Sequence, residues 1–322
     1  MAAEIDFGSV IKRSKDLVFK NRWLWVYGLV VATLTGSGGS GFGNGFSTSD
    51  SKSGKIPPEA QKMVQEVGKA VTDWVATIPA HAWILFGIGL LILIVLGIIV
   101  QWVTISWAKG ALIGGLEEAD KGEIVTLQNT THFGIKSLKK LIIFNIITSL
   151  ISLGTIIALL VVYGLVSLVL SFIQPLMILW MVMSGLLGLL GLIIFLVVLA
   201  MVAIYAERLV VLKDFSPWEA WKKGLAISRG NFLNTVLMGL LNSGIGCGVG
   251  CVTSLVITTV LAIPAVILAI PLFAKNVFWP SIVGLIFLLL VWVTANSLVR
   301  AGLVVFNFSN WKQIFKKVYD KE

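Results

Sequence analysis

One stretch decides the fold of this chain: Ile84-Leu-Phe-Gly-Ile-Gly-Leu-Leu-Ile-Leu-Ile-Val-Leu-Gly-Ile-Ile-Val100. It carries no charged side chain, and a helix of about 20 apolar residues is long enough to cross a bilayer core of roughly 30 Å. Two further apolar blocks cover residues 141–170 and 176–205. The sequence therefore predicts an all-α protein, a polytopic membrane helical bundle.

The composition excludes the soluble classes of protein. Of the 322 residues, 57% are hydrophobic and 13% are charged, and the mean hydropathy is +0.95. A soluble globular chain carries about 25% charged residues. The bilayer is therefore the partner that most of this surface requires.

The basic residues set the expected orientation. Apolar runs bounded by charge predict about six transmembrane helices, at about 23–35, 82–107, 141–163, 176–206, 231–273 with a break, and 278–304. With the N-terminus inside, 20 of the 25 lysines and arginines fall on the inner side, and the other five are Lys52, Lys55, Lys62, Lys69 and Lys275. The positive-inside rule therefore predicts a multi-pass protein of the cell (inner or plasma) membrane with both termini cytoplasmic. We therefore interpret the net charge of +9 as a feature of membrane orientation, and we expect the partners to be the lipid bilayer and membrane or cytoplasmic proteins, not nucleic acid.

A short pattern recurs four times along the chain. A Phe, a Gly or Ser, an apolar residue and a basic pair follow one another at 7–13, 133–140, 215–223 and 308–317. We interpret the chain as a single membrane domain, 1–322, of three hairpin repeats and a terminal helix, at about 4–116, 124–212, 213–306 and 308–320. Each repeat begins with a cytoplasmic amphipathic helix.

The third and fourth copies carry aromatic residues at helical spacing. In the third, Ser216, Pro217 and Glu219 predict a helix start with a capping box. The aromatic residues expected to anchor these helices in the membrane interface are Trp218, Trp221, Trp311 and Phe315. The alternative is that the helices pack on the cytoplasmic face of the protein itself.

The segment 36–81 forms the longest predicted outer loop. Residues 36–53 are a Gly/Ser tract typical of a flexible linker, and 58–78 show the apolar spacing of a surface helix. This helix would dock a partner or lie on the membrane.

Seven polar residues fall inside or at the edge of the predicted spans, and they are the candidate site residues: Gln101, Asn145, Asn242, Asn296, Glu207, Arg208 and Arg300. Because ionisable groups at membrane depth are costly, they usually pair or face a cavity. Equivalent positions in two repeats suggest an ion pair between Glu207 and Arg300. Together these residues either line a polar vestibule for a solute or lipid headgroup, or join helices to one another.

The sequence contains no recognisable catalytic or metal-binding set. His81 and His132, the only histidines, are predicted on opposite sides of the membrane, which excludes a Ser/His/Asp triad or a histidine metal cluster. Cys247 and Cys251 make a poor metal site without a third ligand, and we expect them to pack as small residues. The same packing role is expected for Gly185, Gly188 and Gly191. We therefore expect no cofactor, no metal and no enzymatic activity.

One long stretch carries a family resemblance: Ala206-Glu-Arg-Leu-Val-Val-Leu-Lys-Asp-Phe-Ser-Pro-Trp-Glu-Ala-Trp-Lys-Lys-Gly-Leu-Ala-Ile-Ser-Arg-Gly-Asn-Phe232. It resembles a group of prokaryotic six-span membrane proteins that includes the membrane domain attached to some glycerophosphodiester phosphodiesterases. Lys20-Asn-Arg-Trp-Leu-Trp-Val-Tyr-Gly28 is similar to the same group. The resemblance implies a membrane module without the phosphodiesterase domain, and it transfers no catalytic residue.

Two functions follow as hypotheses. The first is a non-enzymatic membrane protein that organises or senses the membrane or scaffolds partners. The alternative is a transporter or channel for a small solute or lipid, which repeat symmetry and helix-breaking glycines favour.

Overall fold

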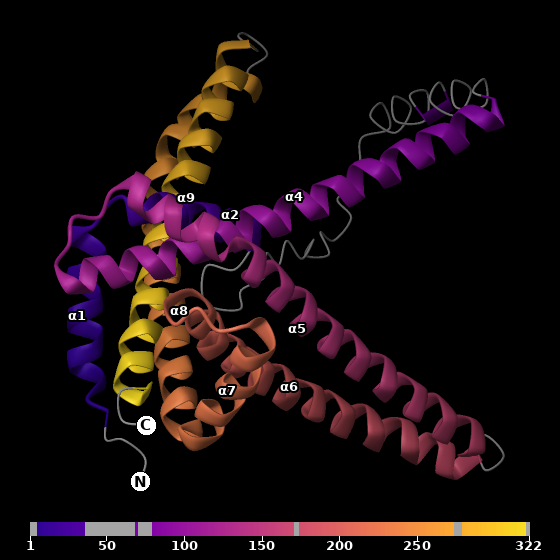
Figure 1. Ribbon diagram of the computed structural model, residues 1–322. Helices are drawn as coiled ribbons and strands as arrows, with labels where there is room; N and C mark the ends of the chain where they lie inside the picture. The colour runs from indigo at the N-terminus through magenta and orange to yellow at the C-terminus, as the bar shows by residue number, and fades with distance from the viewer. Residues whose placement is uncertain (1–4, 36–67, 70–78, 171–173, 274–278, 320–322) are drawn as a thin grey trace. The chain divides into compact units, whose positions relative to one another are not determined.

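The computed structural model describes residues 5–35, 68–69, 79–170, 174–273 and 279–319, and within these ranges it is helical without any strand (Figure 1). The helices are α1 (Phe7–Lys20), α2 (Leu24–Thr35), α4 (Ala80–Lys121), α5 (Leu127–Leu170), α6 (Gln174–Leu212), α7 (Pro217–Gly230), α8 (Phe232–Phe273) and α9 (Trp279–Tyr319). The predicted all-α class is confirmed. Most of the predicted outer loop 36–81, including the Gly/Ser tract and nearly all of the surface helix, lies outside the described residues.

Five of these helices are long and apolar enough to cross a membrane: α4, α5, α6, α8 and α9. Their apolar side chains are exposed over most of their length, as Leu186 and Leu255 illustrate. Helices satisfy their backbone hydrogen bonds internally, which is what a hydrocarbon solvent requires. The chain is therefore a multi-pass membrane protein in contact with lipid. Helix α2 has 12 residues and a length of about 18 Å, shorter than the roughly 30 Å core.

The break predicted within 231–273 is wrong. Helix α8 runs without interruption over 42 residues, through the glycines at 244–250 and through Pro264. Glycine keeps its N–H, and membrane helices tolerate a proline because neighbouring groups satisfy the freed carbonyl.

Contacts divide the chain into two units, residues 1–41 with 104–322, and residues 42–103. In the second unit the first part of α4 exposes its apolar side chains, and Trp83 packs edge-to-face on Phe86. Among the described residues, the buried core belongs to the first unit. Its packed part, which we name the head, consists of α1, α2, α7 and the adjoining ends of the long helices, at about 104–121, 127–145, 201–212, 232–242 and 301–319.

Two clusters of buried apolar side chains fill the head. One joins the ends of α6 and α9 to α7 and includes Tyr205, Leu209 and Ile314. The other joins α2 to α4 and α9 and includes Tyr27 and Leu112. Helix α1 lies alongside the last turns of α9, so the first and last helices of the chain are neighbours in this unit (Figure 1).

The amphipathic segments take two forms. The first and third are separate 14-residue helices, α1 and α7, whereas the second is the start of α5 and the fourth is the end of α9. The expected separate helix 308–320 is thus a continuation of α9, because no proline follows Gly302 to stop it. The capping box predicted for α7 is confirmed, with Ser216 as the N-cap and Glu219 closing the box.

Candidate functional site

Charged side chains meet where α4 and α9 pack together in the head. Lys312 is almost completely buried and donates to the carbonyl oxygen of Leu116 at 3.0 Å. Its Nζ also lies 2.9 Å from Asp120 Oδ2 and 3.1 Å from Glu117 Oε2. A buried ammonium is costly unless its donors are satisfied, and here three oxygens surround it.

Asp120 is the anion that three cations share. Arg13 of α1 pairs with it at 2.7 Å, Lys316 lies 3.3 Å away, and Gln313 donates to it at 3.1 Å. The network thereby ties α1, α4 and α9 into one unit. Burial alone would raise the pKa of Asp120, but the hydrogen bonds from Lys312, Arg13 and Gln313 outweigh it and hold the pKa well below its usual range.

A small polar cavity of about 200 Å³ opens beside this network, between the ends of α4, α6 and α9. We name it the lysine pocket. Its walls carry four lysines, one carboxylate and three apolar or aromatic side chains, namely Lys121, Lys213, Lys312, Lys316, Glu117, Leu212, Phe315 and Tyr319. Lys213 Nζ lies 4.8 Å from the centre of the Tyr319 ring. None of these residues was a candidate in the sequence except Phe315.

The predicted ion pair between Glu207 and Arg300 is wrong. Glu207 is buried and accepts from Lys109 Nζ of α4 at 2.5 Å, and Arg300 is exposed on α9. Arg208 points into the protein, where its guanidinium donates to the carbonyl oxygens of Ile204 and Phe308 at 2.6 and 3.2 Å. Glu207 and Arg208 therefore join α6 to α4 and to α9.

The asparagines take part in separate contacts. Asn242 of α8 donates to Asn307 Oδ1 at 2.9 Å and accepts from Asn310 at 2.7 Å, which fastens α8 to α9. Asn145 donates to Ser106 Oγ at 3.1 Å, which links α5 to α4. Asn296 donates to the carbonyl oxygen of Trp292 in its own helix.

Gln101 lies in the second unit, on an exposed position of α4. The structure therefore does not bring Asn145, Asn242 and Asn296 together in one cavity. Asn145 and Asn242 each join two helices, whereas the hydrogen bond that Asn296 donates stays within α9.

The four expected interface anchors divide into two pairs. Trp311 and Phe315 are buried in the core between α9 and its neighbours, so they contact protein and not lipid. Trp218 is 51% exposed, and its ring stacks on Trp221 with centroids 6.1 Å apart. The interface role predicted for all four aromatic residues therefore fits the geometry of α7 only.

Helix α7 docks on α6 through small residues. Its buried stripe consists of Ala220, Gly224, Ile227 and Ser228. A Cβ at Gly224 would lie 3.0 Å from the carbonyl oxygen of Val202, so the two backbones approach closely. Because Trp218 and Trp221 flank this stripe, α7 packs on the protein and still presents an aromatic edge.

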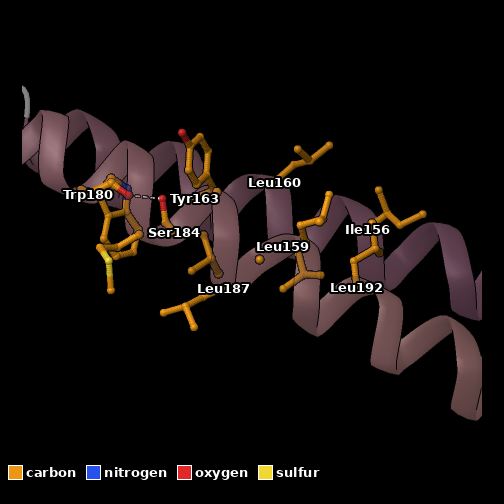
Figure 2. Close-up of a pocket in the computed structure, with 13 residues that line it drawn as sticks. Ile156, Leu159, Leu160, Tyr163, Trp180, Ser184, Leu187 and Leu192 are labelled. Carbon is orange, nitrogen blue, oxygen red and sulfur yellow. Dashed lines mark hydrogen bonds between the residues drawn. The ribbon is translucent and has the colours of Figure 1, made fainter.

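An apolar groove separates α5 from α6 further along the hairpin (Figure 2). It has a volume of about 610 Å³ and includes Gly185 and Gly188 in its wall. Trp180 stacks near Tyr163 and donates to Ser167 Oγ at 3.2 Å. The packing role predicted for the glycines is wrong, because a Cβ at Gly185, Gly188 or Gly191 would meet no atom within 4 Å.

The two cysteines lie on one face of α8, with Sγ atoms 3.9 Å apart, and both are free thiols. No group of three metal-ligating side chains occurs within the described ranges. The expectation for the cysteines stays a prediction.

Comparison of the chain with family models, with curated proteins and with solved structures found no match.

Proposed function

We propose that this chain is a non-enzymatic, six-crossing protein of the cell membrane, with both termini and, apart from the crossing helix α2, the head on the cytoplasmic side. In this position the head organises or senses the membrane or holds partners. The observation that carries the proposal is α7, a helix docked on α6 whose exposed Trp218 has Lys222 Nζ 5.4 Å from its ring centre. An aromatic edge beside lysines is typical of a helix in the membrane interface.

Parity supports six crossings. Arg13 of α1 pairs with Asp120 near the end of α4, so these two ends lie on one side of the membrane. Helix α4 is long and apolar enough to cross the membrane, and we take it to cross once. An odd number of crossings must then precede Ala80, and α2 is the apolar helix described in that interval. One crossing there, added to the five long helices, gives six.

The repeat interpretation is supported by the likeness of α1 and α7. Each has 14 residues and a side-chain N-cap, Asp6 in α1 and Ser216 in α7. Each ends at an asparagine, Asn21 or Asn231, whose side chain donates to the carbonyl oxygen four residues earlier. Each is followed at once by an apolar helix. We also propose that the chain belongs with the six-span group that it resembles.

Spin labelling of α7 tests the proposed interface. Replacing Cys247 and Cys251 by Ala leaves a cysteine-free background, in which a nitroxide is attached at Trp218→Cys or, as a control, at Lys223→Cys on the opposite side of α7. In reconstituted bilayers we expect the label at 218 to collide mainly with oxygen and the label at 223 mainly with a water-soluble nickel chelate. Equal, water-like accessibility at both positions would contradict the proposal.

A second candidate function, movement of a lipid, is favoured by the groove between α5 and α6. Its apolar wall suits an acyl chain. A scrambling assay with fluorescent lipid in liposomes distinguishes the two functions. We expect lipid to move between the leaflets no faster than in liposomes without protein. Faster movement that Gly188→Leu slows would favour lipid transport.

A further inference from the structure

We propose that the lysine pocket binds a phosphate-bearing anion. The pocket belongs to the first unit alone, and its charged groups come from two helices and a turn: Glu117 and Lys121 from α4, Lys213 from the turn after α6, and Lys312 and Lys316 from α9. The inference rests on their charge balance, on their fixed positions and on the size of the cavity.

Positive charge exceeds negative charge in and around the pocket. Glu117 is held by Lys312 at 3.1 Å and by Lys121 at 3.5 Å. Asp120, just behind the wall, has to serve Arg13, Lys312 and Lys316 together. Counting Glu118, which interacts with Lys121, five cations and three carboxylates thus lie in and around the pocket, and the repulsion among the cations falls when a multivalent anion enters.

Two of the ammonium groups are well placed to receive such an anion. Lys213 forms no ion pair with any described residue, and its ammonium is held near the Tyr319 ring. Lys316 is exposed, and it shares its ion-pair partner Asp120 with Arg13 and Lys312. An ammonium carries three donors and binds phosphate as a point charge. Lys213 and Lys316 therefore have free hydrogen-bonding capacity at the mouth of the pocket.

The back of the pocket is rigid and partly apolar. Lys312 is fixed by three oxygen acceptors, and Phe315 is buried beside it. Apolar walls limit the access of water and strengthen a charge interaction. The volume of about 200 Å³ is below the roughly 300–1,000 Å³ of pockets for drug-sized ligands, which suits a single phosphate group.

A lipid headgroup and a free phosphate compound offer the same chemistry, and distance favours the free compound. The last largely exposed apolar residue of α9 before the head is Leu298, and Lys312 lies 14 residues later, about 21 Å along the helix. Even at a helix tilt of about 40° this height is about 16 Å, whereas each headgroup layer is roughly 5–8 Å thick. The pocket therefore faces water beyond the lipid phosphates.

Isothermal titration calorimetry with inorganic phosphate tests the site. The full chain is placed in phosphatidylcholine nanodiscs, and sodium chloride of equal ionic strength serves as the blank. We expect saturable binding that Lys213→Gln/Lys316→Gln weakens by about tenfold or more, because two charge-assisted contacts are lost. The matched control Lys222→Gln/Lys223→Gln removes the same charge from α7 and should change the affinity by less than about twofold.

Further variants and lipids separate the remaining outcomes. Lys213→Gln alone breaks no ion pair, and it should also weaken phosphate binding. It therefore tests the site even if the double variant is poorly folded. Nanodiscs containing phosphatidylglycerol test the lipid source: unchanged phosphate binding supports a water-borne ligand, and loss of it in the wild type assigns the site to a lipid headgroup. The absence of saturable binding in phosphatidylcholine nanodiscs, or equal binding by the wild type and the pocket variants, would overturn the proposal. None of these results depends on where α7 lies, so the site and the proposed function fail separately.

Discussion

Lys312 Nζ on α9 lies 2.9 Å from Asp120 Oδ2 on α4, and each side chain is only 2% exposed. The two residues are 192 positions apart, so their pairing records the tertiary packing of the head. Removing one member of a buried pair leaves the other charge without compensation, which costs about 3–5 kcal/mol.

Asp120→Asn should therefore lower the free energy of unfolding by about 3 kcal/mol or more, because Lys312, Lys316 and Arg13 lose their common anion. The measurement is an unfolding titration in detergent micelles. Glu123→Gln is the matched control, since Glu123 is exposed and forms no ion pair with a described residue; its effect should stay within about 0.5 kcal/mol. Equal stability of the two variants would contradict the central role of Asp120.

The depressed pKa of Asp120 predicts acid lability. The unfolded carboxyl titrates near pH 3.9, and the folded one titrates lower, so the unfolded chain binds the proton first as the pH falls. The stability that Asp120 contributes is therefore complete above about pH 5, begins to fall near the unfolded pKa and is lost progressively as the pH drops further toward the folded pKa. Unfolding midpoints between pH 7 and pH 3 should fall more steeply for the wild type than for Asp120→Asn.

Asp6, Asp214 and Glu219 also have pKa values below their ordinary range. They are present in both proteins, so the difference between the two pH profiles isolates Asp120. Parallel profiles would show that Asp120 titrates normally.

Glu207 pairs with Lys109, and a double-mutant cycle can measure that pairing. Lys109→Met and Glu207→Gln should show a coupling energy of about 0.5–3 kcal/mol, because the two side chains touch at 2.5 Å. Arg300→Met with Glu207→Gln is the matched cycle for the pair expected from repeat symmetry, and its coupling should be near zero. A coupling energy between Arg300 and Glu207, with none between Lys109 and Glu207, would support the pair predicted from the sequence.

Sequence reasoning reached the local features and missed the distant pairings. The long apolar runs predicted helices, and Ser216 with Glu219 predicted the start of α7. Both predictions were possible because each depends on residues close together in the sequence. The partner of Glu207 is 98 positions away, and its position depends on how α4 and α6 are aligned along their axes. Symmetry between repeats supplied a plausible but wrong partner.

The lysine pocket was beyond prediction for a similar reason. From the sequence its lysines contribute only to the charge of the inner side, because each is unremarkable within its own segment. Only the packing of α4, α6 and α9 brings Lys121, Lys213 and Lys316 together. The continuity of α9 could have been predicted from the sequence, since residues 303–319 contain neither glycine nor proline.

Gly28 marks the closest approach of α2 to α9. A Cβ there would lie 2.6 Å from the carbonyl oxygen of Ala301, and a backbone atom cannot rotate away. Gly28→Ala should separate the two helices and lower the free energy of unfolding by about 1–3 kcal/mol. Gly188→Ala is the control within another apolar helix; its Cβ meets no atom, so stability should be unchanged or higher by up to about 1 kcal/mol. A similar loss of stability in both variants would show that replacing a glycine is destabilising by itself, whatever the approach of α2 to α9.

The position of the two chain ends gives a test of the six-crossing proposal. Lys317 of α9 donates to Ser9 Oγ of α1 at 3.1 Å, so a membrane cannot separate the N-terminal helix from the C-terminal one. Reporters fused before Met1 and after Glu322 should therefore give the same result, and the positive-inside rule predicts that it is cytoplasmic. A five-crossing chain would place its ends on opposite sides, and a reporter active outside at one end only would thus exclude both the α1–α9 contact and the sixth crossing. A reporter after Pro79 is the internal control, because α4 leads from that point to the head, and it should report the opposite side.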